Sequence, residues 1–382
     1  MVHSIALAVF WTCGVLLLYV YVGYPLIARM LAAAAPRPVA RSGIRPVVSV
    51  LITAYNEEAG IGAKLDNVLA LDYPSELLEI IVASDASSDR TDSIVESYVS
   101  RRVRLVRVEG RRGKTACQNA AVAEADGEII VFTDATTRLD IGALLAMVQN
   151  FADASVGCVA GSLVYEAQSQ SLTGQGGTAY WSYEIGLRRA ESSLGSLVGV
   201  SGCLYAVRRS AYEPIPADLI SDFVIALRIR ERGLRTILEP AAICFEQTHD
   251  DARNELPMRV RVAIRSINAL VQERRLLNVS RFGVFAWQLW SHKLLRYASP
   301  VLWITALAAN ALLVDRTPYG ALIVAQLVIL AAGVAGFLVQ GNGLSLGILR
   351  KPYYFLLTNA ASLIALIRYL RGERMVTWKP VR

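Results

Sequence analysis

Polar and acidic residues follow hydrophobic, β-branched runs at three places early in the chain. They are Ala54-Tyr55-Asn56-Glu57-Glu58 after the first run, Ser84-Asp85 after the second, and Thr133-Asp134-Ala135-Thr136 after the third. A carboxylate can bind the base or ribose of a nucleotide, and a carboxylate with a divalent cation can bind a diphosphate. The sequence contains neither GxGxxG nor GxxxxGK[ST], so neither a dinucleotide site nor a P-loop is indicated. The residue types therefore favour a nucleotide diphosphate site of another kind.

The elements that must position these residues alternate between strands and helices. The predicted strands are residues 47–53, 78–83, 103–108 and 128–132, and the predicted helices between them are residues 57–71, 90–99 and 113–125. This alternation is typical of an α/β domain with a mainly parallel sheet and helices on both faces. Such sheets bind ligands outside the carboxyl ends of their strands. We therefore expect the three polar stretches to converge at one edge of the sheet.

The composition indicates a membrane protein. Of 382 residues, 54% are hydrophobic and 19% are charged, which is too apolar for an ordinary soluble enzyme. The net charge of +7 does not indicate nucleic acid, because the arginines cluster beside apolar runs, as they do at a cytoplasmic membrane face. The five cysteines are scattered and none forms a CxxC pair, so we predict no zinc site and no disulfide framework.

The amino-terminal run is a predicted membrane anchor. No Asp, Glu, Lys or Arg occurs from Met1 to Ala28, and about 20 apolar residues span a bilayer. A cleaved signal peptide should begin with Lys or Arg, whereas this segment has only His3. Basic residues follow the run, and the positive-inside rule then places the next domain in the cytoplasm and predicts a multi-pass protein of the inner membrane. They are Arg29, Arg37, Arg41 and Arg45.

Further apolar segments follow Arg296. Residues 297–349 are free of charge apart from Asp315 and Arg316, and they predict a transmembrane hairpin. The run Pro352–Ile367 is short for a full span and is followed by basic residues, so we expect an interfacial or re-entrant helix, with a full crossing as the alternative. Aromatic and basic residues mix before the hairpin, which suits a helix lying in the membrane interface.

The expected organisation divides the chain into six parts. They are a transmembrane helix (1–35), a proline-containing linker (36–45), a cytoplasmic catalytic domain (46–275), an amphipathic interface helix (276–296), a transmembrane hairpin (297–349), and a carboxy-terminal interfacial or transmembrane helix with a basic tail (350–382).

The motifs of residues 46–275 resemble, in the same order, those of family-2 glycosyltransferases with a GT-A fold, a Rossmann-like fold for nucleotide-diphospho-sugars. The nearest resemblance is to membrane enzymes related to hyaluronan and cellulose synthases and to exopolysaccharide glycosyltransferases. The matching stretches are TAYNEE for the first-strand motif, SDASSDRT for DDGSTDGT, GRRGKTACQNAA for GKxxALN, FTDATT for DxD, LISDFVIALRIRERG for the TED region, and RNELPMRVRVAIRS in the place of QxxRW.

The resemblance implies roles for single residues. Asp222 matches the catalytic aspartate, which serves the family as general base. The donor-binding residues that it implies are Ala54, Tyr55, Glu57, Asp85, Lys114, Asp134, Ala135 and Arg261. Asp134 would also hold the cofactor, Mg²⁺ or Mn²⁺.

The sequence departs from the family pattern at several positions. Ser84, Thr136 and Ser221 stand where acids are usual, and a hydroxyl is a weaker ligand than a carboxylate for a hard cation. Met258 and Val262 replace the Gln and Trp of QxxRW, a motif that serves the growing chain in the synthases. This departure weakens the case for processive polymerisation.

The acceptor is expected near small and aromatic residues. Gly202, next to Cys203, lets an acceptor approach the backbone, and Trp181 in YWSYE can stack on a sugar. The alternative for this aromatic stretch is a helix face against the membrane. His249 is either a metal ligand or a surface histidine.

The resemblance implies inverting transfer of a sugar from a nucleotide diphosphate donor, with UDP as the expected nucleotide. The expected acceptor is lipid-linked or a saccharide in envelope or exopolysaccharide synthesis, and membrane lipid is an expected partner. Three alternatives stay open: a polyprenyl phosphate acceptor, a processive synthase, and a non-catalytic membrane subunit on a degenerate transferase fold.

Overall fold

The computed structural model describes residues 1–166, 172–247, 252–341 and 349–376, which form two compact units. The first, here called the helical unit, consists of residues 1–34, 167–187 and 248–374. The second, the sheet unit, consists of residues 35–166, 188–247 and 375–382. The long helix α7 (Leu172–Leu194) contributes to both.

The sheet unit contains one eight-stranded mixed sheet with the order β3-β2-β1-β4-β7-β6-β8-β5. Its strands are β1 (Val48–Ala54), β2 (Leu78–Ser84), β3 (Val103–Arg107), β4 (Ile129–Asp134), β5 (Arg138–Leu139), β6 (Val156–Glu166), β7 (Leu204–Arg208) and β8 (Arg235–Gln247). The first four strands pair in parallel. Strand β7 is antiparallel to both neighbours, β5 is antiparallel to β8, and β6 pairs in parallel with β8. The predicted mainly parallel α/β fold is confirmed.

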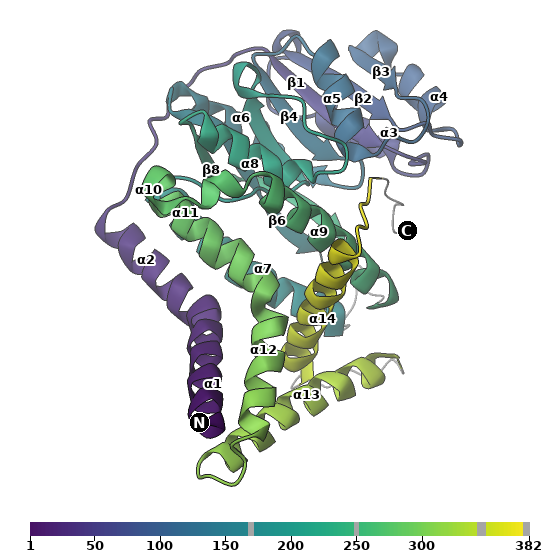
Figure 1. The fold of residues 1–382 in the computed structure, drawn as a ribbon. Helices are drawn as coiled ribbons and strands as arrows, with labels where there is room; N and C mark the ends of the chain where they lie inside the picture. Colours follow the sequence, from purple (N-terminus) through teal and green to yellow (C-terminus); the bar gives the residue numbers. More distant parts are fainter. Residues whose placement is uncertain (167–171, 248–251, 342–348, 377–382) are drawn as a thin grey trace. The chain divides into compact units, whose positions relative to one another are not determined.

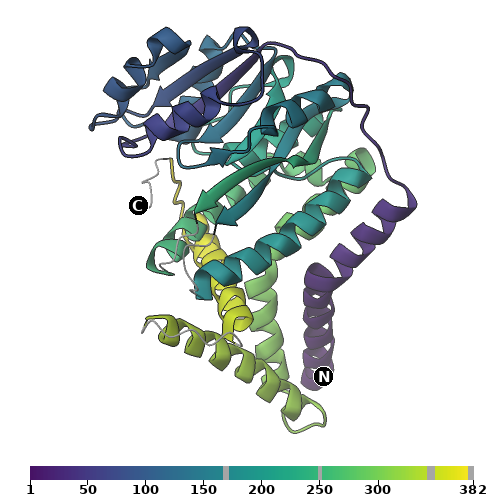
Figure 2. The same ribbon diagram turned by 180° about the vertical axis from the view of Figure 1, so that it is seen from behind.

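The helices of the sheet unit lie against both faces of the sheet (Figures 1 and 2). They are α3 (Ile61–Leu69), α4 (Thr91–Glu96), α5 (Lys114–Glu124), α6 (Ala143–Val148) and α8 (Ser221–Glu231), with short 3₁₀ turns at Ser75–Leu77, Val99–Arg101, Gln149–Ala152 and Arg209–Ala211. Strand β1 is buried along its whole length, because helices cover a parallel sheet on both sides. This accounts for its continuous hydrophobic sequence.

The helical unit is built mainly from the two ends of the chain, together with the first part of α7. Its elements besides α7 are α1 (Val2–Leu18), the π-helix η1 (Tyr19–Gly23), α2 (Tyr24–Ala34), α9 (Ala252–Gln272), the 3₁₀ turn η6 (Arg274–Leu277), α10 (Val279–Phe282), α11 (Val284–Leu289), the π-helix η7 (Trp290–Leu294), α12 (Leu295–Ala311), α13 (Tyr319–Gly341) and α14 (Arg350–Leu370). Helix α1 packs on α12 through a small apolar cluster that includes Phe10, Cys13, Ala306 and Leu313.

In the described part of the chain, three helices are long and apolar enough to cross a membrane: Val2–Ala34, Tyr319–Val339 and Lys351–Leu370. Their outer faces expose large apolar side chains, for example Trp11 at 50% and Val328 at 60%, as expected for lipid-facing helices. Helix α14 is longer than the expected run from 352 to 367, because Arg350 and Lys351 join its first turn. The number of crossings and their orientation stay predictions.

The expected interface helix 276–296 is not continuous. It is divided into α10 and α11 at Gly283, whose φ of +53° favours glycine, and then passes into the π-helix η7. Phe282, Phe285 and Leu289 are buried within the structure. Several apolar residues of this stretch are therefore buried, although Trp290 stays 40% exposed.

Candidate active site

The register of the sheet brings the three polar stretches together. Ala54 at the end of β1 pairs with Ser84 at the end of β2, and Thr53 pairs with Asp134 at the end of β4. The loops after these three neighbouring strands therefore leave the sheet side by side. The convergence predicted from the sequence is confirmed for this edge.

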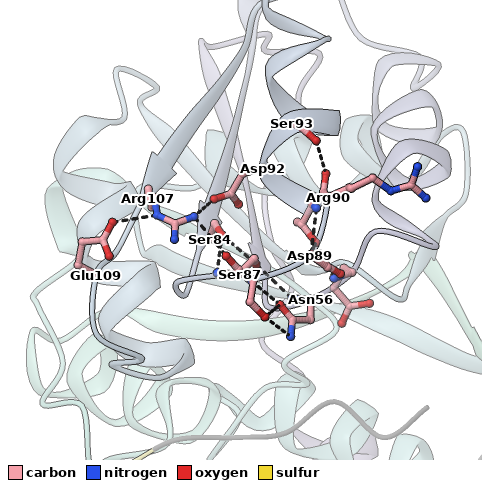
Figure 3. Close-up of polar contacts among 12 residues, drawn as sticks. Asn56, Ser84, Ser87, Asp89, Arg90, Asp92, Ser93, Arg107 and Glu109 are labelled. Atoms are coloured by element: carbon pink, nitrogen blue, oxygen red, sulfur yellow. Dashed lines mark hydrogen bonds and ion pairs between the residues drawn. The ribbon is translucent and has the colours of Figure 1, made fainter.

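The loops after β1 and β2 are joined by a hydrogen-bond network (Figure 3). Asn56 exchanges hydrogen bonds with Ser88, accepting from its backbone N–H at 2.8 Å and donating to its Oγ at 3.2 Å. The backbone N–H of Glu57 donates to Thr91 Oγ1 at 2.7 Å. Both Asn56 and Ala86 have φ of +54°, a conformation that is costly for residues with a side chain and that recurs at functional sites.

Arg107, at the end of β3, contacts the loop that follows β2 (Figure 3). Its guanidinium donates to the carbonyl of Ser87 at 3.3 Å and pairs with Asp92 and with Glu109. Sequence reasoning did not identify Arg107. A basic residue that ends a strand beside an acidic loop was its only available signal.

Asp85 is fully buried and holds the loop before α5. Its carboxylate accepts from the backbone N–H of Arg112 at 2.7 Å and from that of Gly113 at 3.1 Å. The Nε of Arg111 lies 3.3 Å from the same carboxylate, and its guanidinium stacks on the ring of Tyr55 at 3.1 Å from the centroid. Gly113 has φ of +87°, which explains the glycine just before the helix. Contact of Asp85 or Tyr55 with a nucleobase stays a prediction.

Lys114 is the first residue of α5 and forms an ion pair with Asp134. Its Nζ also donates to the carbonyl of Gly202 at 3.5 Å. Burial lowers the pKa of Lys114, but the charge and hydrogen bond of Asp134, together with smaller effects of Asp222 and Cys203, raise it, and the net shift is upward. The lysine predicted to bind the donor therefore lies against the residue predicted to bind the metal.

Asp222 reaches the same place from α8. A Cβ built on Gly202 would lie 3.1 Å from Asp222 Oδ2 and 3.2 Å from Lys114 Nζ, so both side chains approach the space beside this glycine. The N-cap of α8 is Ile220, which means that Asp222 is not the capping residue. Asp134, Lys114, Gly202 and Asp222 thus meet at one point, although they come from four separate segments.

The remaining predicted residues of the sheet unit line or support this site. Ala54 is buried, and its carbonyl accepts from the N–H of Asp85 at 2.9 Å. Ala135 is also buried. The thiol of Cys203 lies 3.4 Å from Glu246 Oε2, and burial raises its pKa, so it is a poor nucleophile. Glu57 contributes its backbone to the loop network described above.

Two predicted residues belong to the helical unit. Trp181 is on α7 and Arg261 is on α9, and both are partly exposed. Burial lowers the pKa of Arg261. Their proposed contacts with acceptor and donor stay predictions, and His249 lies outside the described residues.

The oxygen atoms of this site fit a divalent cation that is bound partly by the protein and partly by a diphosphate. Among the described residues, no group of three or more His, Cys, Asp or Glu side chains could enclose a metal ion. Asp134 offers a carboxylate that is 26% exposed, and Thr136 beside it is exposed. Mg²⁺ is commonly held by one or two carboxylates with water and substrate phosphates completing the shell. Asp134 is suited to that arrangement.

A cavity of about 740 Å³ lies elsewhere in the sheet unit. It is lined by residues that begin the strands, among them Val47, Leu78 and Val103. These positions are at the amino-terminal ends of β1, β2 and β3, opposite the edge that carries Asp85 and Asp134. This cavity is therefore not part of the candidate active site.

The mixed, mainly parallel sheet with acidic residues after its strands is a GT-A-like fold. Residues 49–215, somewhat less than half of the chain, match the model of glycosyl transferase family 2. The chain is 30% identical over 205 residues to the poly-beta-1,6-N-acetyl-D-glucosamine synthase of Staphylococcus aureus (strain COL), a match that covers 52% of this chain and 49% of that protein. The synthase of the same name from Staphylococcus epidermidis is 28% identical over 205 residues, with the same coverage. The chain thus spans about half the length of the curated relatives it matches.

A solved structure is similar along the whole chain. It is a mannosyltransferase from Pyrobaculum calidifontis in complex with GDP-Man and Mn²⁺, with a TM-score of 0.72 and 28% identity. The match covers 98% of this chain and 100% of that protein. The similarity therefore includes the helical unit as well as the sheet unit.

Proposed function

We propose that the chain is a membrane glycosyltransferase that moves a sugar from a nucleotide diphosphate donor to a lipid-linked or saccharide acceptor in envelope or exopolysaccharide synthesis. The observation that carries this proposal is the convergence of Asp134, Lys114 and Asp222 on Gly202. Two carboxylates and one ammonium group are thereby brought together in a partly buried site. The names of the relatives support sugar transfer as the reaction.

The residues divide the reaction between them. Asp134 would hold Mg²⁺ or Mn²⁺ with the diphosphate, and the cation supplies positive charge for the leaving group. Lys114 adds a second positive charge beside it. Asp222 takes the proton of the acceptor hydroxyl, whose oxygen bonds to the anomeric carbon as the bond to the nucleotide diphosphate breaks. Inversion at that carbon follows from the family resemblance.

The nucleotide of the donor has two candidates. The family resemblance favours UDP, whereas the mannosyltransferase that matches the whole chain was solved with GDP-Man. The Tyr55 ring offers an aromatic face that suits either base, and the buried Asp85 fixes the loop that carries Arg111 beside it. We propose UDP as the first donor and GDP as the alternative.

The acceptor is proposed to lie at the membrane surface. Three helices long and apolar enough to span a bilayer accompany the sheet unit in the described part of the chain, and the basic residues after the first span favour a cytoplasmic site at the inner membrane. The synthase relatives make a polymer by name, but Met258 and Val262 replace the Gln and Trp of QxxRW. Transfer of single sugars is therefore preferred, with polyprenyl phosphate as the alternative acceptor and processive synthesis as the alternative mode.

The test measures nucleotide diphosphate release from a panel of UDP- and GDP-sugars by the purified full chain, with and without Mn²⁺. We expect one donor to be hydrolysed slowly in a metal-dependent manner, and Asp222→Asn to lose this activity while still binding the nucleotide. The exposed Asp126→Asn is the matched control, because its side chain is 82% exposed and lies outside the site. Absence of nucleotide binding by wild-type protein would favour the non-catalytic subunit instead.

A further inference from the structure

A buried lysine lies behind the strand end that carries Asp134. Lys64 is on α3, and its side chain is 3% exposed. Lysine is almost never fully buried unless it is paired. Its Nζ donates to Thr133 Oγ1 at 2.9 Å, to the carbonyl of Thr137 at 2.6 Å and to Thr137 Oγ1 at 3.3 Å. The three bonds give the ammonium group a full set of acceptors.

The acceptors of Lys64 are the two ends of one turn. Thr133 and Thr137 enclose Asp134, and their hydroxyls lie 2.9 Å apart. The hydroxyl of Thr137 also donates to the carbonyl of Asp134 at 3.0 Å, and its N–H donates to the same carbonyl at 3.3 Å. Lys64 thus closes a ring of hydrogen bonds around the backbone of Asp134.

The charges around Lys64 match this position. Burial lowers the pKa of Lys64 to about 7, and the charge of Asp134 opposes that shift, followed by smaller effects of Cys244 and Cys203. A buried ammonium costs free energy unless it is fully hydrogen-bonded and faces a negative charge. A methionine or leucine would fill the same space without this cost. The hydrogen bonds to the Thr133–Thr137 turn, and not packing in the hydrophobic core, therefore explain why a lysine is present at this position.

We propose that Lys64 is a positioning residue, whose ammonium group fixes the Thr133–Thr137 turn so that the Asp134 carboxylate faces the divalent cation and the donor diphosphate. This inference rests on the proposed function. Lys64 does not touch the donor site itself. It acts on the ligand through the turn, as outer hydrogen-bond partners of metal ligands do.

The test compares two variants of α3 in the full chain. Lys64→Met keeps the length and apolar stem of the side chain but removes the donor group. Asn67→Ala is the matched control, because Asn67 bonds the backbone of Leu139 in both directions, at 2.8 and 2.9 Å, just beyond the turn. Both variants lose hydrogen bonds between α3 and the same segment, and only the first loses those around Asp134.

The readout is the Mn²⁺ concentration that half-saturates binding of UDP or GDP, measured by calorimetry and by the spin-resonance signal of free Mn²⁺. We expect Lys64→Met to raise this concentration about 10- to 100-fold, the usual effect of removing an outer partner of a metal ligand. Asn67→Ala should lower the unfolding temperature without changing metal dependence. Wild-type metal dependence in Lys64→Met, or an equal shift in Asn67→Ala, would overturn the inference.

A second variant covers the case in which Lys64→Met does not fold. Thr137→Val keeps the shape of the side chain and removes the hydroxyl that bonds Lys64 and Asp134. We expect the same direction of shift in Mn²⁺ dependence, and an unchanged dependence would contradict the inference. If wild-type protein binds neither UDP nor GDP with Mn²⁺, the proposed function fails; if it binds them and the variants bind alike, only the role of Lys64 fails.

Discussion

Substitution of Gly202 by alanine tests the active-site assignment most directly. The added Cβ would lie 3.1 Å from Asp222 Oδ2 and 3.2 Å from Lys114 Nζ, distances at which the neighbour must move by a few tenths of an ångström. Both neighbours are ends of side chains, so the fold can absorb the change. Gly202 does not have a positive φ, so alanine can adopt the same backbone conformation.

The expected loss is in the chemical step. A misplacement of about 1 Å at a reacting group costs on the order of 100-fold in rate, so a shift of a few tenths predicts about a 3- to 10-fold loss in kcat. The free energy of unfolding should change by less than about 1 kcal/mol, because no backbone or core atom is displaced. Nucleotide affinity should change less than kcat, since Asp222 is assigned to the acceptor side.

The assay is donor hydrolysis, or transfer once an acceptor is known, with denaturant unfolding in parallel. Gly142→Ala is the matched control, because a Cβ there would meet only Asp140 Oδ1, at an ordinary 3.6 Å. A wild-type kcat in Gly202→Ala would refute the assignment of Asp222 and Lys114 to the reacting centre. An equal loss in both variants would show a general effect on the domain.

Three other perturbations follow from buried charges. Asp85→Asn removes a fully buried carboxylate that holds two backbone N–H groups, so we expect about 1.5–3 kcal/mol lower unfolding free energy in denaturant, with weakened nucleotide binding by calorimetry. The pKa of Lys64 is about 7 in the folded protein, against an ordinary value of 10.5. Between pH 7 and pH 10.5 the unfolded chain therefore binds more protons than the folded protein. The unfolding free energy of the wild type, relative to Lys64→Met, should therefore rise from pH 7 to pH 9 in denaturant titrations, and a falling difference would contradict this. Glu184→Gln removes a buried carboxylate whose Oε1 lies 2.9 Å from His292. We expect the free energy of unfolding, measured for the protein in detergent, to fall by about 3–5 kcal/mol. Glu373→Gln is the control, because Glu373 pairs with Arg368 at the surface, and we expect the free energy of unfolding to fall by only about 0–1 kcal/mol.

The strands and the acidic edge could be predicted from the sequence because they depend on local patterns. Continuous apolar runs bounded by polar residues gave β1, β2, β3 and β4 to within about two residues, which is the usual uncertainty of element ends. The rule that parallel strands end at one edge then placed Asp85 and Asp134 together. The ion pair between Asp134 and Lys114 was not predicted, because the sequence does not show how near the first turn of α5 lies to the end of β4.

The second half of the sheet could not be predicted in the same way. Strand β7 lies between β4 and β6 and runs antiparallel to both, so its place depends on contacts between distant segments. The position of Gly202 beside Asp222, just before β7, depends on the same contacts between distant segments. The sequence alone shows only a glycine after an apolar stretch. Lys64 was missed because a single lysine on an amphipathic helix gives no sign that it is buried.

The acids missing from the family pattern change the electrostatics of the site rather than remove it. Serine or threonine stands at 84, 136 and 221, which leaves single carboxylates at Asp85, Asp134 and Asp222. The first two already face basic side chains, Arg111 and Lys114. The net negative charge available to a free cation is therefore small, and a hydroxyl adds little attraction for a hard cation. A diphosphate brings the missing negative charge, so the cation should bind together with the nucleotide and only weakly before it. The three substitutions are thus compatible with catalysis, provided that metal and donor enter the site as one complex.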